Sequence, residues 1–118
     1  MRICGGNARG IQLKTLDIAD LRPATDMLRQ ALFNSLAADI PGCRFLDLFA
    51  GCGAYGLEAI SRGAVSGVFV EKHPKLKAVI ETNLAAVAKS AGVEAKPFEV
   101  RSADALNFPA VAESFDIV

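Results

Sequence analysis

The 118-residue chain carries 13 basic and 13 acidic side chains, so its overall charge gives no sign of a polyanionic partner. Hydrophobic residues make up 52% and charged residues 22%, which is typical of a globular chain and excludes an intrinsically disordered one. The length accommodates one domain at most.

Cysteine usage and the absence of long apolar runs predict the compartment. Cys4, Cys43 and Cys52 are odd in number and widely spaced, which fits neither a zinc site nor a disulfide framework. No apolar run approaches the ~18 residues that a membrane span needs, and the first residues lack the layout of a signal peptide. We therefore expect a cytoplasmic protein without a membrane partner.

Residues 1–16 predict a short β-hairpin, because the turn-forming sequence Gly-Gly-Asn lies between segments with alternating apolar residues. This segment contains Arg2, Arg9 and Lys14 and no acidic residue. The three cations are candidates to neutralise phosphates. An ordinary solvated surface is an equal alternative, because three charges make a modest electrostatic footprint.

A helix is predicted after Thr25, whose hydroxyl suits an N-cap, and the Pro-Gly pair at 41–42 stops it. Leu28, Leu32 and Leu36 recur every fourth residue. This spacing predicts that the leucine face of the helix is buried.

The stretch from residue 44 to 56 is the most informative part of the chain. An apolar run interrupted by Asp47 leads into Gly51, Gly53 and Gly56. A buried strand that feeds a glycine turn and then a helix gives this pattern, and such a turn lets a ligand approach the main chain. We interpret it as a loop for a nucleotide-type cofactor, with a tight turn that holds no ligand as the alternative.

The rest of the chain alternates between strand and helix patterns. The predicted elements are a helix over residues 55–62, a strand over 65–70, a helix over 74–90, a strand over 95–100, a short helical turn over 106–112 and the opening of a fourth strand over 115–118. The helix over 74–90 has an apolar stripe formed by Leu76, Ile80, Leu84 and Val87. This alternation predicts an α/β, Rossmann-like parallel sheet.

Three acidic residues are expected at the carboxyl ends of the strands, where open α/β sheets bind ligands. They are Asp47, Glu71 and Asp104, and Glu71 follows Gly51 by the twenty residues typical of an acid that binds a ribose. Asp47 would repel a pyrophosphate but attract an ammonium or sulfonium group. The pattern favours S-adenosyl-L-methionine over NAD, although each acid alone is equally well explained as a cap or a solvated strand end.

Several separate motifs resemble the RsmD family, methyltransferases that modify a guanine N2 atom of small-subunit (16S) ribosomal RNA. They are MRICGGNARGIQL (1–13), LRPATD (21–26), ALFNSL (31–36), DLFAGCGAYGLEAISRGA (47–64), VFVEKH (68–73) and SADAL (102–106). The chain departs from the usual family residues at Ala24, Cys52 and Tyr55, and we interpret Tyr55 as a packing residue.

This resemblance implies a class I methyltransferase fold with a hairpin extension (1–20), a leading helix (21–42) and the cofactor-binding half of the sheet (43–118). By analogy, the glycine loop with Asp47 holds the methionine end of the cofactor, Glu71 its ribose and Asp104 its adenine edge. The full set of expected cofactor-binding residues is Asp47, Ala50, Gly51, Gly53, Glu71, Lys72, Asp104 and Ala105. The expected RNA-binding residues are Arg2, Arg9, Lys14 and Arg22.

In the family, the strand that opens at residues 115–118 leads into an (N/D)PPY-like catalytic loop, which this sequence does not contain. The resemblance therefore implies a cofactor-binding part that is inactive by itself. The outer edge of residues 115–118 would be bare, which predicts self-association, and a clean monomer in sedimentation at high concentration would contradict it. An NAD-binding Rossmann module and a non-catalytic binding domain are the alternatives.

Overall fold

The computed structural model describes residues 1–15, 25–48, 50–104 and 115–118. Its elements are α1 (Asp26–Ser35), β1 (Arg44–Leu48), α2 (Ala54–Ser61), β2 (Ser66–Glu71), α3 (Pro74–Ala91) and β3 (Phe98–Ser102). Within these residues, the strands form one parallel sheet in the order β1-β2-β3. The predicted Rossmann-like α/β architecture is confirmed.

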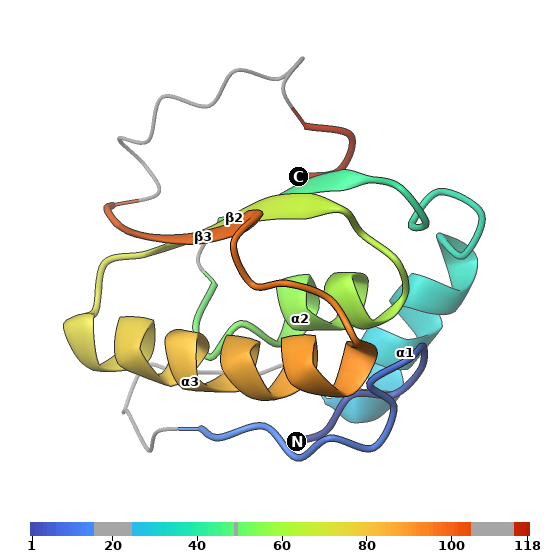
Figure 1. Cartoon of the computed structure of the whole chain (residues 1–118), viewed down its shortest axis with the longest axis horizontal. Helices are drawn as coiled ribbons and strands as arrows, with labels where there is room; N and C mark the ends of the chain where they lie inside the picture. The colour runs from blue at the N-terminus through green and yellow to red at the C-terminus, as the bar shows by residue number, and fades with distance from the viewer. Residues whose placement is uncertain (16–24, 49, 105–114) are drawn as a thin grey trace.

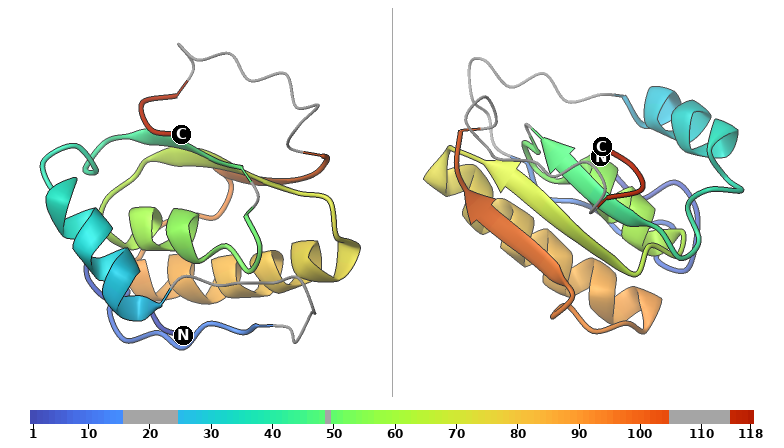
Figure 2. Two further views of the ribbon diagram at one scale, coloured as in Figure 1. Left: turned by 180° about the vertical axis from the view of Figure 1, so that it is seen from behind. Right: turned by 90° about the horizontal axis from the view of Figure 1, so that it is seen from above.

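Helices α2 and α3 lie side by side on one face of the sheet, and α1 lies at the end of this helix layer beside α2 (Figures 1 and 2). The parallel register pairs Asp47 with Phe69 and Glu71 with Ser102. All three strands therefore end at the same edge of the sheet, which is where ligands of such folds bind.

Three phenylalanine rings form the contact between the sheet and its helices. Gly67 lies between Phe45 and Phe98 in the register, and its lack of a side chain lets these two rings stack at a centroid distance of 6.0 Å. Phe45 also meets Phe69 edge-on at 5.2 Å. A Cβ added at Gly56 of α2 would lie 2.3 Å from the Phe69 ring. Glycines at these two positions therefore allow α2 to pack closely on the sheet.

Helix α1 begins as predicted but buries a different face. The hydroxyl of Thr25 accepts a hydrogen bond from the Leu28 N–H at 3.1 Å, which confirms the N-cap. The buried residues of α1 are Arg29 and Phe33. The prediction of a buried leucine face is wrong, because its members are exposed or half-buried: Leu28 (60% exposed), Leu32 (43% exposed) and Leu36. Helix α1 is anchored on α2 through the guanidinium of Arg29 rather than through these leucines.

Helix α3 and the end of α2 match their predictions closely. The predicted stripe of α3 is buried along its length, and Gly92 closes the helix with a φ of 72°. Gly63 follows the last residues of α2 with a φ of 112°, as expected for a glycine just beyond a helix end. Among the residues that the structure describes, no helix is both long and apolar enough to cross a bilayer.

The third strand begins later than predicted. Residues 95–97 form a turn, closed by a hydrogen bond from the Phe98 N–H to the Ala95 carbonyl at 2.9 Å. Pro97 has no N–H to donate to a ladder, which explains why pairing starts only at Phe98. The predicted helical turn at 106–112 lies outside the described residues.

The two ends of the chain each make one isolated bridge. Arg2 pairs with Gln12 in antiparallel fashion, so residues 1–15, which we call the N-terminal arm, have the course of a hairpin without forming strands of the sheet. Ile117 pairs with Phe45 in parallel fashion, and its carbonyl accepts the Leu46 N–H at 2.8 Å. The predicted fourth strand is thus represented by one bridge on the open edge of β1.

Candidate cofactor site at the glycine loop

The turn between β1 and α2, residues 50–53, forms what we call the glycine loop. Gly51 and Gly53 have φ values of 60° and 87°, a left-handed conformation that favours glycine. The Gly53 N–H donates to the Ala50 carbonyl at 2.8 Å, and the Ala50 N–H donates to the Val70 carbonyl at 3.0 Å. The loop is therefore fixed to the end of β2 and presents its main chain at the carboxyl edge of the sheet.

Glu71, the last residue of β2, holds this loop in place. One carboxylate oxygen accepts the Gly51 N–H at 2.9 Å, and the other accepts the His73 N–H at 3.0 Å. Each carboxylate oxygen has two lone pairs, so both oxygens keep room for a further donor. Glu71 can thus support the loop and still accept hydrogen bonds from a ligand.

Asp47 lies on β1 beneath the loop and accepts the Gly56 N–H at 3.1 Å, which caps the first turn of α2. Burial raises the pKa of Asp47 to about 7, although the hydrogen bond from Gly56 acts in the opposite direction and the charge of Glu71 adds to the rise. The two carboxylates therefore repel each other, and a cationic group placed near them would stabilise the ionised form of Asp47.

The other expected cofactor residues lie around the same edge. Asp104 follows β3 by two residues and is half-buried, Lys72 is exposed beside Glu71, and Ala50 is buried in the loop. Ala105 and the expected RNA-binding residue Arg22 lie outside the described residues. The structure therefore brings Asp47, Glu71 and the loop together and places Asp104 at the same end of the sheet.

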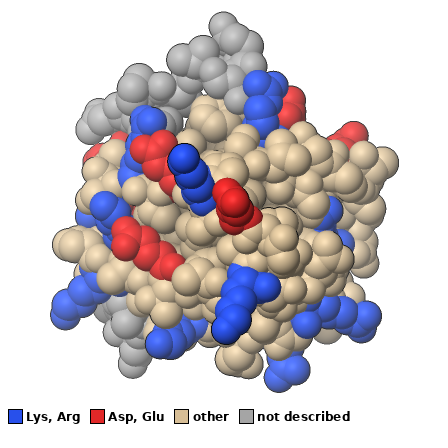
Figure 3. Space-filling model, in the orientation of Figure 1, with Lys and Arg blue, Asp and Glu red and all other residues tan. Residues whose placement is uncertain are grey.

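The N-terminal arm lies on the side of the helix layer that faces away from the sheet (Figure 1). Arg2, Arg9 and Lys14 are exposed on it. In Figure 3, the described residues on the lower part of the visible face, where Figure 1 places the arm and the underside of α3, show basic side chains and no acidic ones. The arm thus contributes to a locally basic surface on a molecule with zero net charge.

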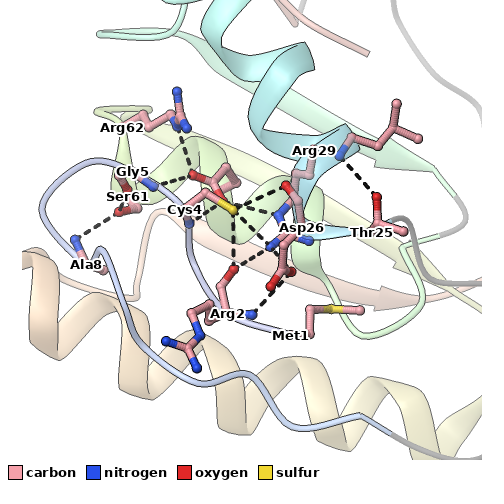
Figure 4. Close-up of polar contacts among 12 residues, drawn as sticks. Met1, Arg2, Cys4, Gly5, Ala8, Thr25, Asp26, Arg29, Ser61 and Arg62 are labelled. Atoms are coloured by element: carbon pink, nitrogen blue, oxygen red, sulfur yellow. Dashed lines mark hydrogen bonds and ion pairs between the residues drawn. The ribbon is translucent and has the colours of Figure 1, made fainter.

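A buried cluster of charges, which the sequence analysis did not predict, fastens the arm to the helices (Figure 4). Arg29 and Glu58 are both fully buried and lie 3.2 Å apart. Glu58 also accepts the Arg62 Nε–H at 2.8 Å and the backbone N–H groups of Cys4 and Gly5 at 3.0 Å. We call this the Arg29–Glu58 cluster. The only signal for it was a single acid in the otherwise apolar sequence of α2.

An apolar groove of about 530 Å³ runs between α1, α2 and the open edge of β1. Leu32, Leu36, Leu48 and Ile117 are among the residues that line it. Tyr55 also lines the groove, and its ring packs against Phe33 at a centroid distance of 6.3 Å. Leu32 and Leu36 thus face this groove, and Tyr55 packs against α1.

Comparisons with known proteins agree with this architecture. Residues 1–118 match the family model described as "Conserved hypothetical protein 95". Ribosomal RNA small subunit methyltransferase D of Escherichia coli K12 is 45% identical over 85 residues, which are 72% of this chain and 43% of that protein.

Two solved structures give the same picture. The E. coli protein yhhF superimposes with a TM-score of 0.76 at 37% identity, covering 92% of this chain and 55% of that one. An RNA methyltransferase from Salinibacter ruber in complex with S-adenosyl-L-homocysteine superimposes with a TM-score of 0.59 at 26% identity. The superposition covers 74% of this chain and 53% of that one. The chain spans about half the length of the proteins that it matches. Since the family model matches from the first residue to the last, the chain belongs to the conserved hypothetical protein 95 family, which is the RsmD family.

Proposed function

We propose that this chain is the cofactor-binding part of an S-adenosyl-L-methionine-dependent RNA methyltransferase. The observation that carries the proposal is the pairing of two mutually repelling carboxylates, Asp47 and Glu71, at one glycine loop. A dinucleotide would bring a pyrophosphate to this place and add to the repulsion. An adenosyl amino acid brings an ammonium group, which the carboxylates attract.

Each part of the cofactor has a candidate partner at this edge of the sheet. The ammonium group would lie near Asp47 and the main chain of the loop, and the ribose hydroxyls would donate to Glu71. Asp104 would accept a hydrogen bond from the adenine amino group. Lys72 and Ala105, which follow Glu71 and Asp104 in the sequence, are further proposed contacts. When bound, S-adenosyl-L-methionine supplies a methyl group on a sulfonium. The complex of the S. ruber relative with S-adenosyl-L-homocysteine supports this choice of ligand.

The proposed substrate of the whole protein is small-subunit ribosomal RNA, as the name of the E. coli relative suggests. The resemblance to the RsmD family implies that the methylated atom is a guanine N2. Arg2, Arg9 and Lys14 on the arm, together with Arg22, are proposed to contact phosphates, which would fix the register of the protein on its RNA. Replacing all four with Ala should flatten the dependence of RNA affinity on salt, and an unchanged slope would reject this role.

A cytoplasmic location and self-association through residues 115–118 also remain proposals.

A thermal-shift comparison tests the proposed cofactor. We expect S-adenosyl-L-homocysteine to raise the unfolding midpoint of the chain by a few °C and NADH to leave it unchanged, because only a bound ligand stabilises the folded state. The ligand's ammonium group favours the ionised form of Asp47, so affinity should rise as the pH passes through about 7. If only the ionised form binds, affinity should be about tenfold higher at pH 8 than at pH 6.

Asp47→Asn is the matched variant for this experiment, because its side chain keeps the shape of Asp47 without titrating. We expect the pH dependence between 6 and 8 to disappear in this variant. A midpoint raised by NADH instead would favour a dinucleotide-binding module. A midpoint that neither ligand moves would favour a domain without a cofactor.

A further inference from the structure

Both ends of the N-terminal arm are linked to Cys52 of the glycine loop, Met1 directly and Lys14 through Asn83 of α3. The sulfur of Met1 lies 3.4 Å from the sulfur of Cys52. At the other end, the Lys14 N–H donates to the Asn83 Oδ1 atom at 2.8 Å. The Nδ2 group of Asn83 donates to the Lys14 carbonyl at 3.0 Å and to the Cys52 carbonyl at 3.2 Å. One side chain of α3 therefore joins the arm to the loop.

Asn83 is only 2% exposed and belongs to the buried face of α3 that also carries Ile80, Leu84 and Val87. A buried amide without partners is costly, so this side chain is stable only when its three hydrogen bonds form. Two of them require the arm and one requires the loop. Asn83 thus makes all three hydrogen bonds only when both the arm and the glycine loop are in place.

We infer that Asn83 is a positioning residue for the glycine loop. By holding the Cys52 carbonyl, it fixes the orientation of the peptide groups between Gly51 and Gly53, whose main chain is proposed to face the cofactor. It also makes the loop depend on the arm, because the same amide group is held by Lys14. The functional part of this inference rests on the proposed cofactor site, whereas the structural part does not.

Ser61 offers a matched control, because it holds the arm without touching the loop. Its Oγ atom accepts the Ala8 N–H at 2.9 Å and donates to the Gly5 carbonyl at 2.6 Å. Ser61 is as buried as Asn83, with 2% of its surface exposed. Ser61→Ala should therefore loosen the arm in the middle, while Asn83→Leu removes the link to the loop at nearly constant volume.

The experiment measures amide hydrogen exchange at the glycine loop without ligand, and the affinity of the chain for the ligand. In the ligand-free chain, amide hydrogen exchange at Gly51 and Gly53, followed by NMR, should become about tenfold faster in Asn83→Leu than in Ser61→Ala. The affinity for S-adenosyl-L-homocysteine, measured by calorimetry, should fall about tenfold in Asn83→Leu and by less than about twofold in Ser61→Ala.

Equal exchange rates at the loop in the two variants would overturn the role of Asn83. If the unsubstituted chain binds no S-adenosyl-L-homocysteine while the exchange rates still differ, the proposed cofactor fails and the positioning role stands. Should Asn83→Leu not unfold cooperatively, Asn83→Asp replaces it. That variant keeps the acceptor for the Lys14 N–H and loses both donors, so faster exchange at the loop remains the expected result and unchanged exchange the contrary one.

Discussion

Replacing Arg29 with Met is expected to lower the free energy of unfolding by about 3 to 5 kcal/mol, the usual effect of breaking a buried ion pair by removing one partner. The variant leaves the carboxylate of Glu58 without exposure to water and without the guanidinium that lies 3.2 Å from it. It also removes the hydrogen bonds that the Arg29 Nη2 group donates to the Arg2 carbonyl and to Asp26. The arm and α1 would therefore lose their common anchor.

Glu58 keeps one cationic partner in this variant, because Arg62 still lies 2.8 Å from it. We therefore expect the loss to fall in the lower half of the range. Urea denaturation measures it, with Lys77→Met as the control, because the Lys77–Glu81 pair spans 3.9 Å at the surface. An exposed pair of this kind contributes less than about 1 kcal/mol. Equal losses in the two variants would show that the Arg29–Glu58 cluster contributes no more than a surface pair.

Gly56→Ala is expected to destabilise the chain by about 1 to 3 kcal/mol, the typical effect of overpacking a core. Helix propensity alone predicts the opposite, because Ala is favoured over Gly inside a helix by about 1 kcal/mol. At Gly56, packing outweighs helix propensity and decides that the free energy of unfolding falls. The added Cβ would lie 2.3 Å from a carbon of Phe69 and 2.7 Å from one of Phe45, far inside any normal contact. Helix α2 would have to move away from the sheet.

The same movement would disturb the glycine loop, because Gly56 donates its N–H to Asp47 from this position. A double-mutant cycle with Phe69→Leu checks the cause by urea denaturation. Removing the Phe69 ring relieves the closer of the two contacts, so Gly56→Ala should cost at least about 1 kcal/mol less in that background. A higher free energy of unfolding for Gly56→Ala alone would show that propensity outweighs packing.

The chain's periodicity predicted α3 and failed for α1, and the difference has a physical reason. In α3 the apolar stripe lies on the face that packs on the sheet, so spacing alone identifies the buried side. In α1 the same spacing places Leu28 and Leu32 outside, because Arg29 sets the orientation through a partner on α2. A salt bridge between residues 29 positions apart leaves no trace in local periodicity.

The sequence predicted which acidic residues lie at the candidate site but not the hydrogen bonds that they make there. Parallel strands end at a common edge, so acids near strand ends must lie near one another, and this reasoning placed Asp47 and Glu71 correctly. It did not predict that both carboxylates hold backbone N–H groups around the loop. Asn83 was invisible in the sequence, because a single amide in a helix gives no sign of the segments that it bonds.

The course of the N-terminal arm has a consequence for how the protein is made. The arm is synthesised before the helices on which it docks, because its partners include Glu58, Ser61 and Asn83, the last of these 69 residues after Lys14. At ordinary rates of translation, the arm waits about 3 to 14 seconds before its final docking partner has been synthesised. Although it is made before α2 and α3, the arm is thus among the last segments to reach its final position, and it stays open to chaperones and proteases until α3 has emerged.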